Sequence, residues 1–315
     1  MIKLSETLCN VCFILTKVPE ALVIVLVRIK ELIVGKKKKS IKNNLVLITG
    51  AGSGLGQLLA IEIAKLGARV LILDINTTGL VNTERKIEAV GGNCRKFTCD
   101  VADSEAVYKI ANEIKRTEEK HVSFLINNAG IISDNKPIEE KSDYKINLSF
   151  NVNAISHFWT IKAFLPGMIH HRQGHITNIA SIAGLMGCSL MSDYISSKFA
   201  AVGIHEALTI ELHERHLENC INTTLVCPYF IDTGMFSGVK RNKINAILPI
   251  STPEHAVKRI MNGILTNEQE IFIPKTLMCL YWLKALLPTK ASLYFSDRIG
   301  TMNVMKTFQG RKTDC

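Results

Sequence analysis

The chain has 315 residues, 47% of them hydrophobic, which is enough to bury one large core, so one domain with appendages is expected. Its formal net charge is +10, but seven basic residues and only one acid fall between Arg28 and Lys42. Such a basic block beside an apolar segment indicates anionic lipid head groups and argues against nucleic acid, for which scattered basic and aromatic residues are typical.

The first 43 residues are predicted to associate with a membrane. The apolar stretch 8–34 contains five charged residues, and its charge-free runs, such as 21–27, are far shorter than the roughly 20 residues that cross a bilayer core. The segment therefore either lies along one leaflet or forms a tilted span with its charges at the interface. A cleaved signal peptide is disfavoured, because no small-residue cleavage site precedes Lys36. The lysines 36–39 favour a cytosolic position for the remaining chain.

Residues 44–274 alternate between short strand-like runs and helical patterns, which is typical of βαβ units. Strands are expected at 44–49, 68–74, 93–100, 122–127, 174–180, 221–227 and 270–274. Helices are expected at 54–66, 79–91, 103–119, 143–171, 192–217 and 253–266. The predicted fold class is α/β, with a Rossmann-type, doubly wound, seven-stranded parallel sheet covered by helices on both faces.

Residues 275–315 form a C-terminal extension that begins with the apolar run 275–288. This run contains Tyr281, Trp282 and two lysines, a composition that suits the head-group zone of a membrane. We expect an interfacial helix here, and a helix packed on the core is the alternative.

Three glycines, Gly50, Gly54 and Gly56, follow the first expected strand and begin the first expected helix. Glycine permits a tight turn and close approach of the backbone to a pyrophosphate, while the start of the helix offers unpaired N–H groups. The flanking strand, helix and second strand strengthen this otherwise weak signal, so we predict a dinucleotide-binding turn.

Asp74 ends the second expected strand, about twenty residues after Gly56, where a carboxylate accepts hydrogen bonds from the adenosine ribose hydroxyls. A 2′-phosphate at that place would meet a like charge. The expected cofactor is therefore NAD rather than NADP.

Tyr194 and Lys198 are four residues apart on an expected helix, so both project from one face. A tyrosine pKa of about 10 is too high for efficient acid–base work at neutral pH, and an adjacent ammonium with an oxidised nicotinamide would lower it. Ser181 is placed to hold the substrate oxygen whose proton Tyr194 removes, and Asn153 to complete a water-linked proton path to Lys198. A tyrosine and a lysine at this spacing are common on exposed helices. The hypothesis of a catalytic site therefore depends on the presence of all four residues together.

In order and spacing, "TGAGSGLG", "NNAG" (127–130), Asn153, Ser181 and "YISSK" (194–198) resemble the short-chain dehydrogenase/reductase superfamily over residues 44–274. The resemblance implies that Ser181, Tyr194, Lys198 and Asn153 are catalytic. It also implies a set of cofactor-binding residues: Thr49, Gly50, Ser53, Gly54, Leu55, Gly56, Asp74, Asp100, Val101, Asn127, Ala129, Gly130, Tyr194, Lys198, Pro228, Ile231 and Thr233. One departure is Tyr229 after Pro228, where the family usually has glycine, and this side chain is expected to narrow the cleft.

Finer motifs such as "DINTTGL", "KAFLPGMI" and "VCPYFIDTGMF" are similar to the 16C branch of that superfamily. The likeness implies an enzyme of the endoplasmic reticulum or lipid droplet that oxidises all-trans-retinol with NAD, and it also implies a homodimer. Three alternatives stay open: a 17-beta-hydroxysteroid dehydrogenase, an NADP-dependent carbonyl reductase, and a non-catalytic lipid-surface protein.

No metal site is expected. Cys9 and Cys12 form a lone CxxC pair, and the nine cysteines show no repeated spacing, as in reduced cytosolic proteins. His170, His171 and His175 lack partners at ligand spacing and are interpreted as solvated surface residues. The loop 230–250, which follows the sixth strand, is the expected substrate lid.

Overall fold

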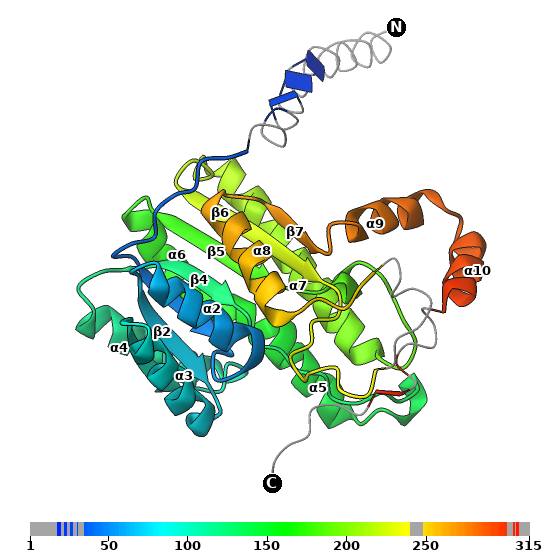
Figure 1. Cartoon of the computed structure of the whole chain (residues 1–315), viewed down its shortest axis with the longest axis horizontal. Coiled ribbons are helices and arrows are strands. Elements are labelled where there is room, and N and C mark those ends of the chain that lie inside the picture. The colour runs from blue at the N-terminus through cyan, green and yellow to red at the C-terminus, as the bar shows by residue number, and fades with distance from the viewer. Residues whose placement is uncertain are drawn as a thin grey trace, which may run out of the picture. The chain divides into compact units, whose positions relative to one another are not determined.

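The computed structural model of the chain describes residues 18–19, 22–23, 26–27, 30, 35–239, 248–300, 305 and 307–308 (Figure 1). It divides into two compact units, Met1–Lys39 and Ser40–Cys315. Most of the expected apolar stretch 8–34 lies outside the described residues. Within the described part of the chain, no helix combines the length and apolarity needed to span a membrane.

The second unit contains seven parallel strands in the order β3-β2-β1-β4-β5-β6-β7, which confirms the predicted fold class. The strands are β1 (Leu45–Thr49), β2 (Arg69–Asp74), β3 (Asn93–Thr98), β4 (Val122–Asn127), β5 (Gly174–Ile179), β6 (Ile221–Pro228) and β7 (Glu270–Ile273). Every residue of β1, β4 and β5 is buried, as expected for strands covered on both faces. The strand order reverses between β1 and β4, and such a switch point opens a crevice at the carboxyl ends of the strands.

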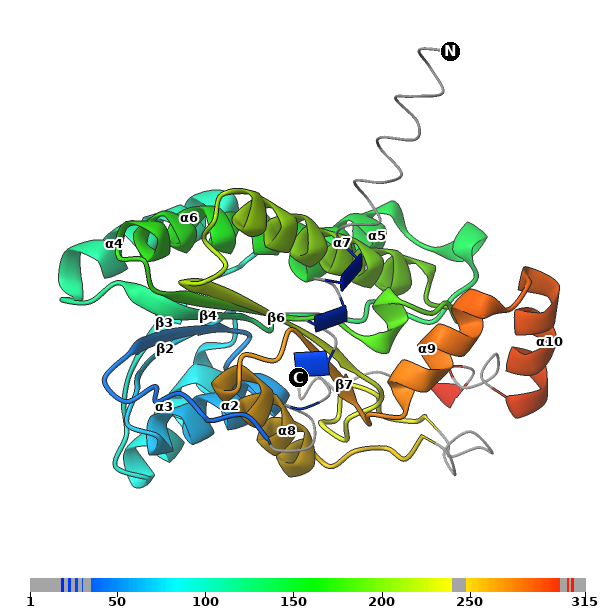
Figure 2. The same ribbon diagram turned by 90° about the horizontal axis from the view of Figure 1, so that it is seen from above.

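Two helical layers cover the sheet (Figure 2). One layer contains α2 (Gly54–Lys65), α3 (Thr77–Ala89) and α8 (Pro253–Leu265). The other contains α4 (Ser104–Thr117), α5 (Asp143–Phe150), α6 (Ser156–His170) and α7 (Ser192–Glu214). Each layer buries its own apolar cluster against the sheet, for example around Ile63 and Ile260 on the first side and around Ile114 and Phe164 on the second.

The prediction of a single helix over 143–171 is wrong. The segment divides into α5, a π-helical turn at Asn151–Ile155 and then α6. Asn153, inside the widened turn, is fully buried and bonds the backbone of Ile131. Widened turns of this kind often occur at functional sites, and the tertiary contact of Asn153 leaves no trace in hydrophobic periodicity.

The C-terminal extension forms α9 (Leu277–Leu286) and α10 (Thr289–Ile299), of which α10 was not predicted. Only the start of α9 is buried, since Leu277 is 1% exposed whereas Trp282 and Leu286 are 60% and 81% exposed. Lys284 Nζ attaches the last turn of α9 to the carbonyl of Leu185 at 2.7 Å.

Candidate active site

The turn between β1 and α2 adopts the geometry that a phosphate site needs. Gly50 and Gly54 have φ angles of 65° and 55°, which favour glycine. A Cβ on Gly56 would lie 2.1 Å from the carbonyl oxygen of Gly50, so no larger residue fits there. Ser53, the N-cap of α2, makes no side-chain capping bond. The first N–H groups of this helix can therefore bind an anion.

Asn128 connects this turn to the end of β4. Its Nδ2 donates to the carbonyls of Thr49 and Gly50 at 3.0 and 3.1 Å. In return, the Thr49 hydroxyl accepts the N–H groups of Asn128 and Ala129 at 3.0 and 3.1 Å. Asn127, Ala129 and Gly130 were predicted to bind the cofactor, but this role of Asn128 was not predicted, and the paired asparagines were its only signal in the sequence.

Asp74 lies against the glycine turn, where the sequence placed it. Its Oδ2 accepts the N–H of Gly52 at 2.8 Å, and its Oδ1 accepts the N–H of Asn76 at 2.9 Å. These bonds orient the carboxylate at the carboxyl end of β2. Asp100, after the neighbouring β3, accepts the N–H of Ala102 at 2.9 Å, and Val101 beside it is buried.

The remaining cofactor residues are also located at the carboxyl ends of the strands. A Cβ on Gly54 would lie 3.4 Å from Thr233 Cβ, so the segment after β6 meets the glycine turn. Pro228 ends β6, and Ile231 pairs with Ser251 in an isolated bridge. The residues from both sides of the switch point therefore meet at the carboxyl ends of the strands.

Ser181 and Tyr194 are hydrogen-bonded to each other through their side chains. Ser181 Oγ also accepts the N–H of Ala183 at 3.1 Å and donates to the carbonyl of Pro228 at 3.4 Å. Tyr194 is 5% exposed, and burial raises its pKa to about 12, although the bond with Ser181 acts to lower it. In the protein alone, the pKa of the Tyr194 phenol thus lies above its ordinary value. The sequence predicted a lowered pKa for the state in which the oxidised cofactor is bound.

Lys198 and Asn153 meet beside Gly130. A Cβ on Gly130 would lie 3.3 Å from both Lys198 Nζ and Asn153 Oδ1. Lys198 Nζ donates to the carbonyl of Ile179 at 3.0 Å and lies 5.9 Å from the centre of the Tyr194 ring. Burial lowers the pKa of Lys198 to about 8, although Cys227 acts to raise it. The four expected catalytic residues therefore converge on one buried region.

Asn127 lies in a buried chain of polar side chains behind the crevice. Its Nδ2 donates to Asn178 Oδ1 at 2.9 Å, and its Oδ1 accepts the hydroxyl of Thr160 at 2.7 Å. Asn178 in turn bonds His205 Nδ1 at 3.2 Å. Asn127 thus links β4, β5, α6 and α7. Thr160, Asn178 and His205 were not expected to take part.

An apolar cluster surrounds Tyr194. It includes residues from the start of α7, the segment after β6, α9 and the C-terminal segment: Met191, Tyr229, Phe230, Phe236, Leu277, Met305 and Phe308. Tyr229 contacts the ring of Phe230 at a centroid distance of 4.5 Å. Residues 240–247 of the expected lid lie outside the described residues.

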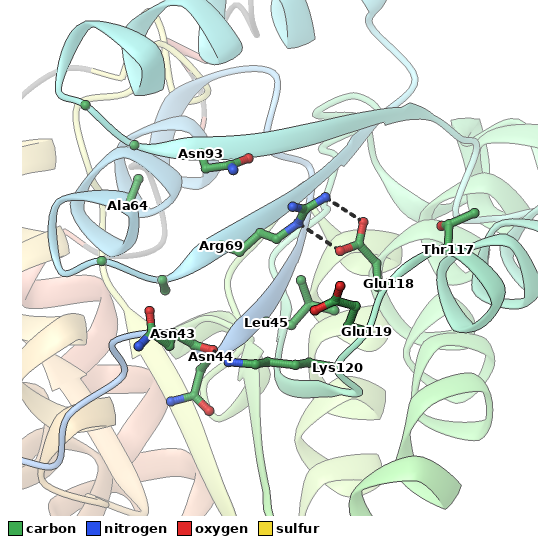
Figure 3. A pocket seen from close by; sticks show the side chains of 14 residues that line it. Asn43, Asn44, Leu45, Ala64, Arg69, Asn93, Thr117, Glu118, Glu119 and Lys120 are labelled. Carbon is green, nitrogen blue, oxygen red and sulfur yellow. Dashed lines mark hydrogen bonds and ion pairs between the residues drawn. The ribbon is translucent and has the colours of Figure 1, made fainter.

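A cavity of about 460 Å³ opens at the opposite end of the sheet, among the amino ends of β1, β2 and β3. Figure 3 shows its polar lining, in which the Arg69 guanidinium pairs with the Glu118 carboxylate at 2.8 Å. None of the four predicted catalytic residues lines this cavity. It is therefore separate from the crevice at the carboxyl ends.

The interpretation of His175 as a solvated residue is wrong. Its side chain lies within β5 with 1% of its surface exposed, and Nε2 bonds the hydroxyl of Thr224 at 2.9 Å. The sheet position overrides the polar character of the residue, because one face of a buried strand must point into a covering layer. His170 and His171 lie at the end of α6, as expected.

Comparison with known proteins gives the same result as the site. Residues 44–244 match the short chain dehydrogenase family. The chain is 39% identical over 310 residues to epidermal retinol dehydrogenase 2 of Mus musculus, covering 98% of this chain and 99% of that protein. It is also 39% identical over 277 residues to estradiol 17-beta-dehydrogenase 11 of Homo sapiens, covering 88% and 90%.

The crystal structure of a short chain dehydrogenase/reductase from Burkholderia phymatum in complex with NAD has the same fold. Its TM-score is 0.70 at 24% sequence identity, and the match covers 78% of this chain and 94% of that chain. A glycine turn at the switch point, with the converging serine, tyrosine and lysine, defines an oxidoreductase that uses a nicotinamide cofactor. The chain belongs to the short-chain dehydrogenase family.

Proposed function

We propose that the protein is a membrane-associated, NAD-dependent dehydrogenase that oxidises a lipophilic alcohol, with all-trans-retinol as the first candidate. One observation carries the proposal: Tyr194 bonds Ser181 and also lies inside an apolar cluster. A reactive phenol in apolar surroundings suits an alcohol that is attached to a long hydrocarbon body. The names of the relatives support a retinoid, and a 17-beta-hydroxysteroid is the second candidate.

The chemistry follows from the positions of the four side chains. Ser181 holds the substrate oxygen, and Tyr194 removes its proton while hydride leaves the carbinol carbon. NAD, when bound, supplies the hydride acceptor and a positive charge that favours the phenolate. Lys198, whose Nζ lies near the tyrosine ring, holds the ribose and adds positive charge. Asn153, beside Gly130, continues the proton path from Lys198.

NAD is favoured over NADP by the carboxylate of Asp74. Its Oδ2 already accepts the N–H of Gly52, so the charge is fixed beside the turn that would hold the adenosine ribose. The negative charge of Asp74 would repel a 2′-phosphate at this position, and no cation among the described residues is bonded to this carboxylate. An NADP-dependent carbonyl reductase is the alternative, and turnover with each cofactor on purified membranes decides between the two.

Attachment to the endoplasmic reticulum or to lipid droplets is part of the proposal. Helices α9 and α10 expose large apolar residues at high density: Met278, Trp282, Leu283, Leu286, Leu293, Tyr294 and Phe295. Lysines and an arginine lie on the same helices, as suits an anionic interface. Exposed Phe158 on α6 and Phe199 on α7 support the proposed homodimer through the long helices.

The deciding experiment is a retinol oxidation assay with NAD on membranes from cells that express the protein. Tyr194→Phe should abolish turnover, since it removes only the phenol oxygen. Tyr144→Phe, at a tyrosine that is 72% exposed on α5, is the matched control and should retain full activity. Full activity of Tyr194→Phe would refute the mechanism. Cofactor binding without turnover of any retinoid or steroid would instead favour the non-catalytic lipid-surface protein.

Deletion of residues 1–34 tests the N-terminal attachment. We expect weaker membrane binding after the deletion, and a further change in binding or topology when Lys36–Lys39 are neutralised. Unchanged partition between the membrane and soluble fractions would refute the attachment role of this segment.

A further inference from the structure

A buried ionic network lies directly beside the catalytic tyrosine. Asp193 precedes Tyr194 in the first turn of α7, and both Asp193 and Lys141 have side chains that are 1% exposed. Lys141 Nζ lies 2.7 Å from Asp193 Oδ1 and 2.7 Å from Asp134 Oδ1. Lys145 Nζ lies 3.2 Å from the other oxygen of Asp134. Two carboxylates and two ammonium groups therefore balance in charge.

Hydroxyl groups complete the coordination of Asp193. Its Oδ2 accepts the hydroxyl of Ser149 on α5 at 2.8 Å and also accepts the hydroxyl of Ser133. The N-cap of α7, Met191, makes no side-chain capping bond. The side chain of Asp193 thus attaches the first turn of α7 to Ser133, to Lys141 and to α5.

The ionic state of the network follows from these contacts. Burial acts to raise the pKa of Asp193, but the bonds from Lys141, Ser133 and Ser149 outweigh it and hold this pKa below its usual range. Burial acts to lower the pKa of Lys141, but the bonds to Asp134 and Asp193 raise it above its usual range. Both groups are therefore charged at neutral pH, and loss of either partner would leave a buried charge poorly compensated.

The segment Ile131–Asn135 joins this network to the rest of the site. The Asn153 side chain bonds the backbone of Ile131, and Ile132 packs in the apolar cluster around Tyr194. Ser133 and Asp134 belong to the ionic network, and Asn135 Nδ2 donates to the carbonyl of Met305 at 3.0 Å. Five consecutive residues thus connect Asn153, Asp193 and the C-terminal segment that covers the apolar cluster.

We propose that Asp193, held by Lys141, is a positioning residue that fixes Tyr194 relative to the segment Ile131–Asn135 at the substrate side of the site. The inference rests on the proposed dehydrogenase function. Asp193 acts through the placement of the first turn of α7, and its side chain is committed to Lys141, Ser133 and Ser149 rather than to the reacting atoms.

Kinetics of three variants test the proposal. Asp193→Asn keeps the shape of the side chain and removes its charge, and Lys141→Met removes the cation. Each should lower kcat for alcohol oxidation about tenfold or more, since small displacements of a catalytic group cost this much. The Kd for NAD should change far less than kcat, because Asp74 and the glycine turn are not touched. The double variant should lose no more than either single variant, as expected for two residues that act as one unit.

Glu268→Gln is the matched control. Glu268 forms a part-buried, two-bond ion pair with Arg259 at the amino end of β7, the end of the sheet opposite the site. This variant should lower the thermal midpoint of unfolding and leave kcat at the wild-type value. Should Asp193→Asn fail to fold, Ser149→Ala removes a single bond to the same carboxylate and should lower kcat to a smaller extent.

Hydrogen exchange gives a readout that does not depend on the substrate. Asp193→Asn should speed amide exchange in residues 131–135 and 192–195, and Glu268→Gln should not. A kcat of Asp193→Asn within about twofold of wild type, at equal folded fraction, overturns the proposal. If wild type oxidises no alcohol, the proposed function fails, and unchanged exchange in both segments then overturns the positioning role separately.

Discussion

The side chain of Asn153 binds the backbone of Ile131 through both of its polar atoms. Asn153 Oδ1 accepts the N–H of Ile131 at 2.8 Å, and Asn153 Nδ2 donates to the carbonyl of Ile131 at 3.0 Å. The same Nδ2 also reaches the hydroxyl of Ser197 at 3.0 Å. A residue expected to relay protons thus also fastens the loop after β4 to the helix that carries Tyr194.

Asn153→Ala should therefore reduce both stability and activity. The change leaves the N–H and carbonyl of Ile131 without their partner in a part-buried place, and each such loss costs about 1–3 kcal/mol. We expect the free energy of unfolding in urea to fall by about 2–4 kcal/mol and retinol oxidation to be lost. Unchanged stability with lost activity would assign Asn153 to the proton path alone.

Gly56→Ala should abolish dinucleotide binding. The added methyl group would lie 2.1 Å from the carbonyl oxygen of Gly50 and 2.5 Å from Asn128 Nδ2, so the turn must open. Gly203→Ala, at an exposed site on α7 with no atom within 4 Å of the new methyl, is the control and should stabilise the helix by about 0.5–1 kcal/mol. Quenching of protein fluorescence by NADH measures the binding. Normal binding by Gly56→Ala would contradict the assigned role of the turn.

Asp74→Asn should shift the cofactor preference. Loss of the charge weakens the bonds to the ribose hydroxyls and removes the repulsion of a 2′-phosphate, so the ratio of NAD to NADP affinity should fall about tenfold or more. Asp103→Asn is the control. The Asp103 side chain caps α4 by accepting the N–H of Glu105, and asparagine caps helices equally well. Calorimetric titration with both cofactors measures the ratio. A wild-type preference for NADP would overturn the use of Asp74.

His157 should make the protein sensitive to mild acid. It is 1% exposed, and neither ring nitrogen has a hydrogen-bond partner among the described residues. Burial, with help from Lys198 and His205, lowers its pKa from 6.5 to about 3. The unfolded chain therefore binds a proton as the pH falls below 6.5 while the folded chain does not, so stability present above pH 6.5 is lost toward pH 3.

Between pH 7 and pH 5 this loss is about 2 kcal/mol for His157. His205, whose burial lowers its pKa to about 4, adds a loss of similar size. His157→Phe should remove about half of the combined acid sensitivity, measured by urea unfolding at the two pH values. An unchanged difference between pH 7 and pH 5 in the variant would show that the imidazole is already solvated in the folded state.

The sequence predicted the central strands β1 and β4 well because they are largely apolar runs. Leu45–Thr49 and Val122–Asn127 agree with the expected 44–49 and 122–127 to within one residue. The glycine turn and Asp74 were equally visible, since their spacing is set by the local geometry of one strand–turn–helix unit. The roles of the individual cofactor residues, and the domain boundaries at 43 and 274, stay predictions.

The features that the sequence did not predict depend on contacts between distant segments. The π-helical turn at Asn151–Ile155 follows the inward direction of Asn153, and the burial of His175 follows its place in the sheet. The pairing of Lys141 with Asp193 joins the loop before α5 to the first turn of α7, two segments whose separate patterns each look like an ordinary charged surface. Hydrophobic periodicity reports which face of an element is buried but not which polar side chains meet there.

The position of β1 between β2 and β4 has a consequence for folding during synthesis on the ribosome. One neighbour, β2, is synthesised soon after β1, but the other ends only at Asn127, beyond three intervening helices. Until that strand has been synthesised, the five residues of β1 that become buried, four of them apolar, have one unpaired edge, and the nascent chain is exposed to aggregation through this edge.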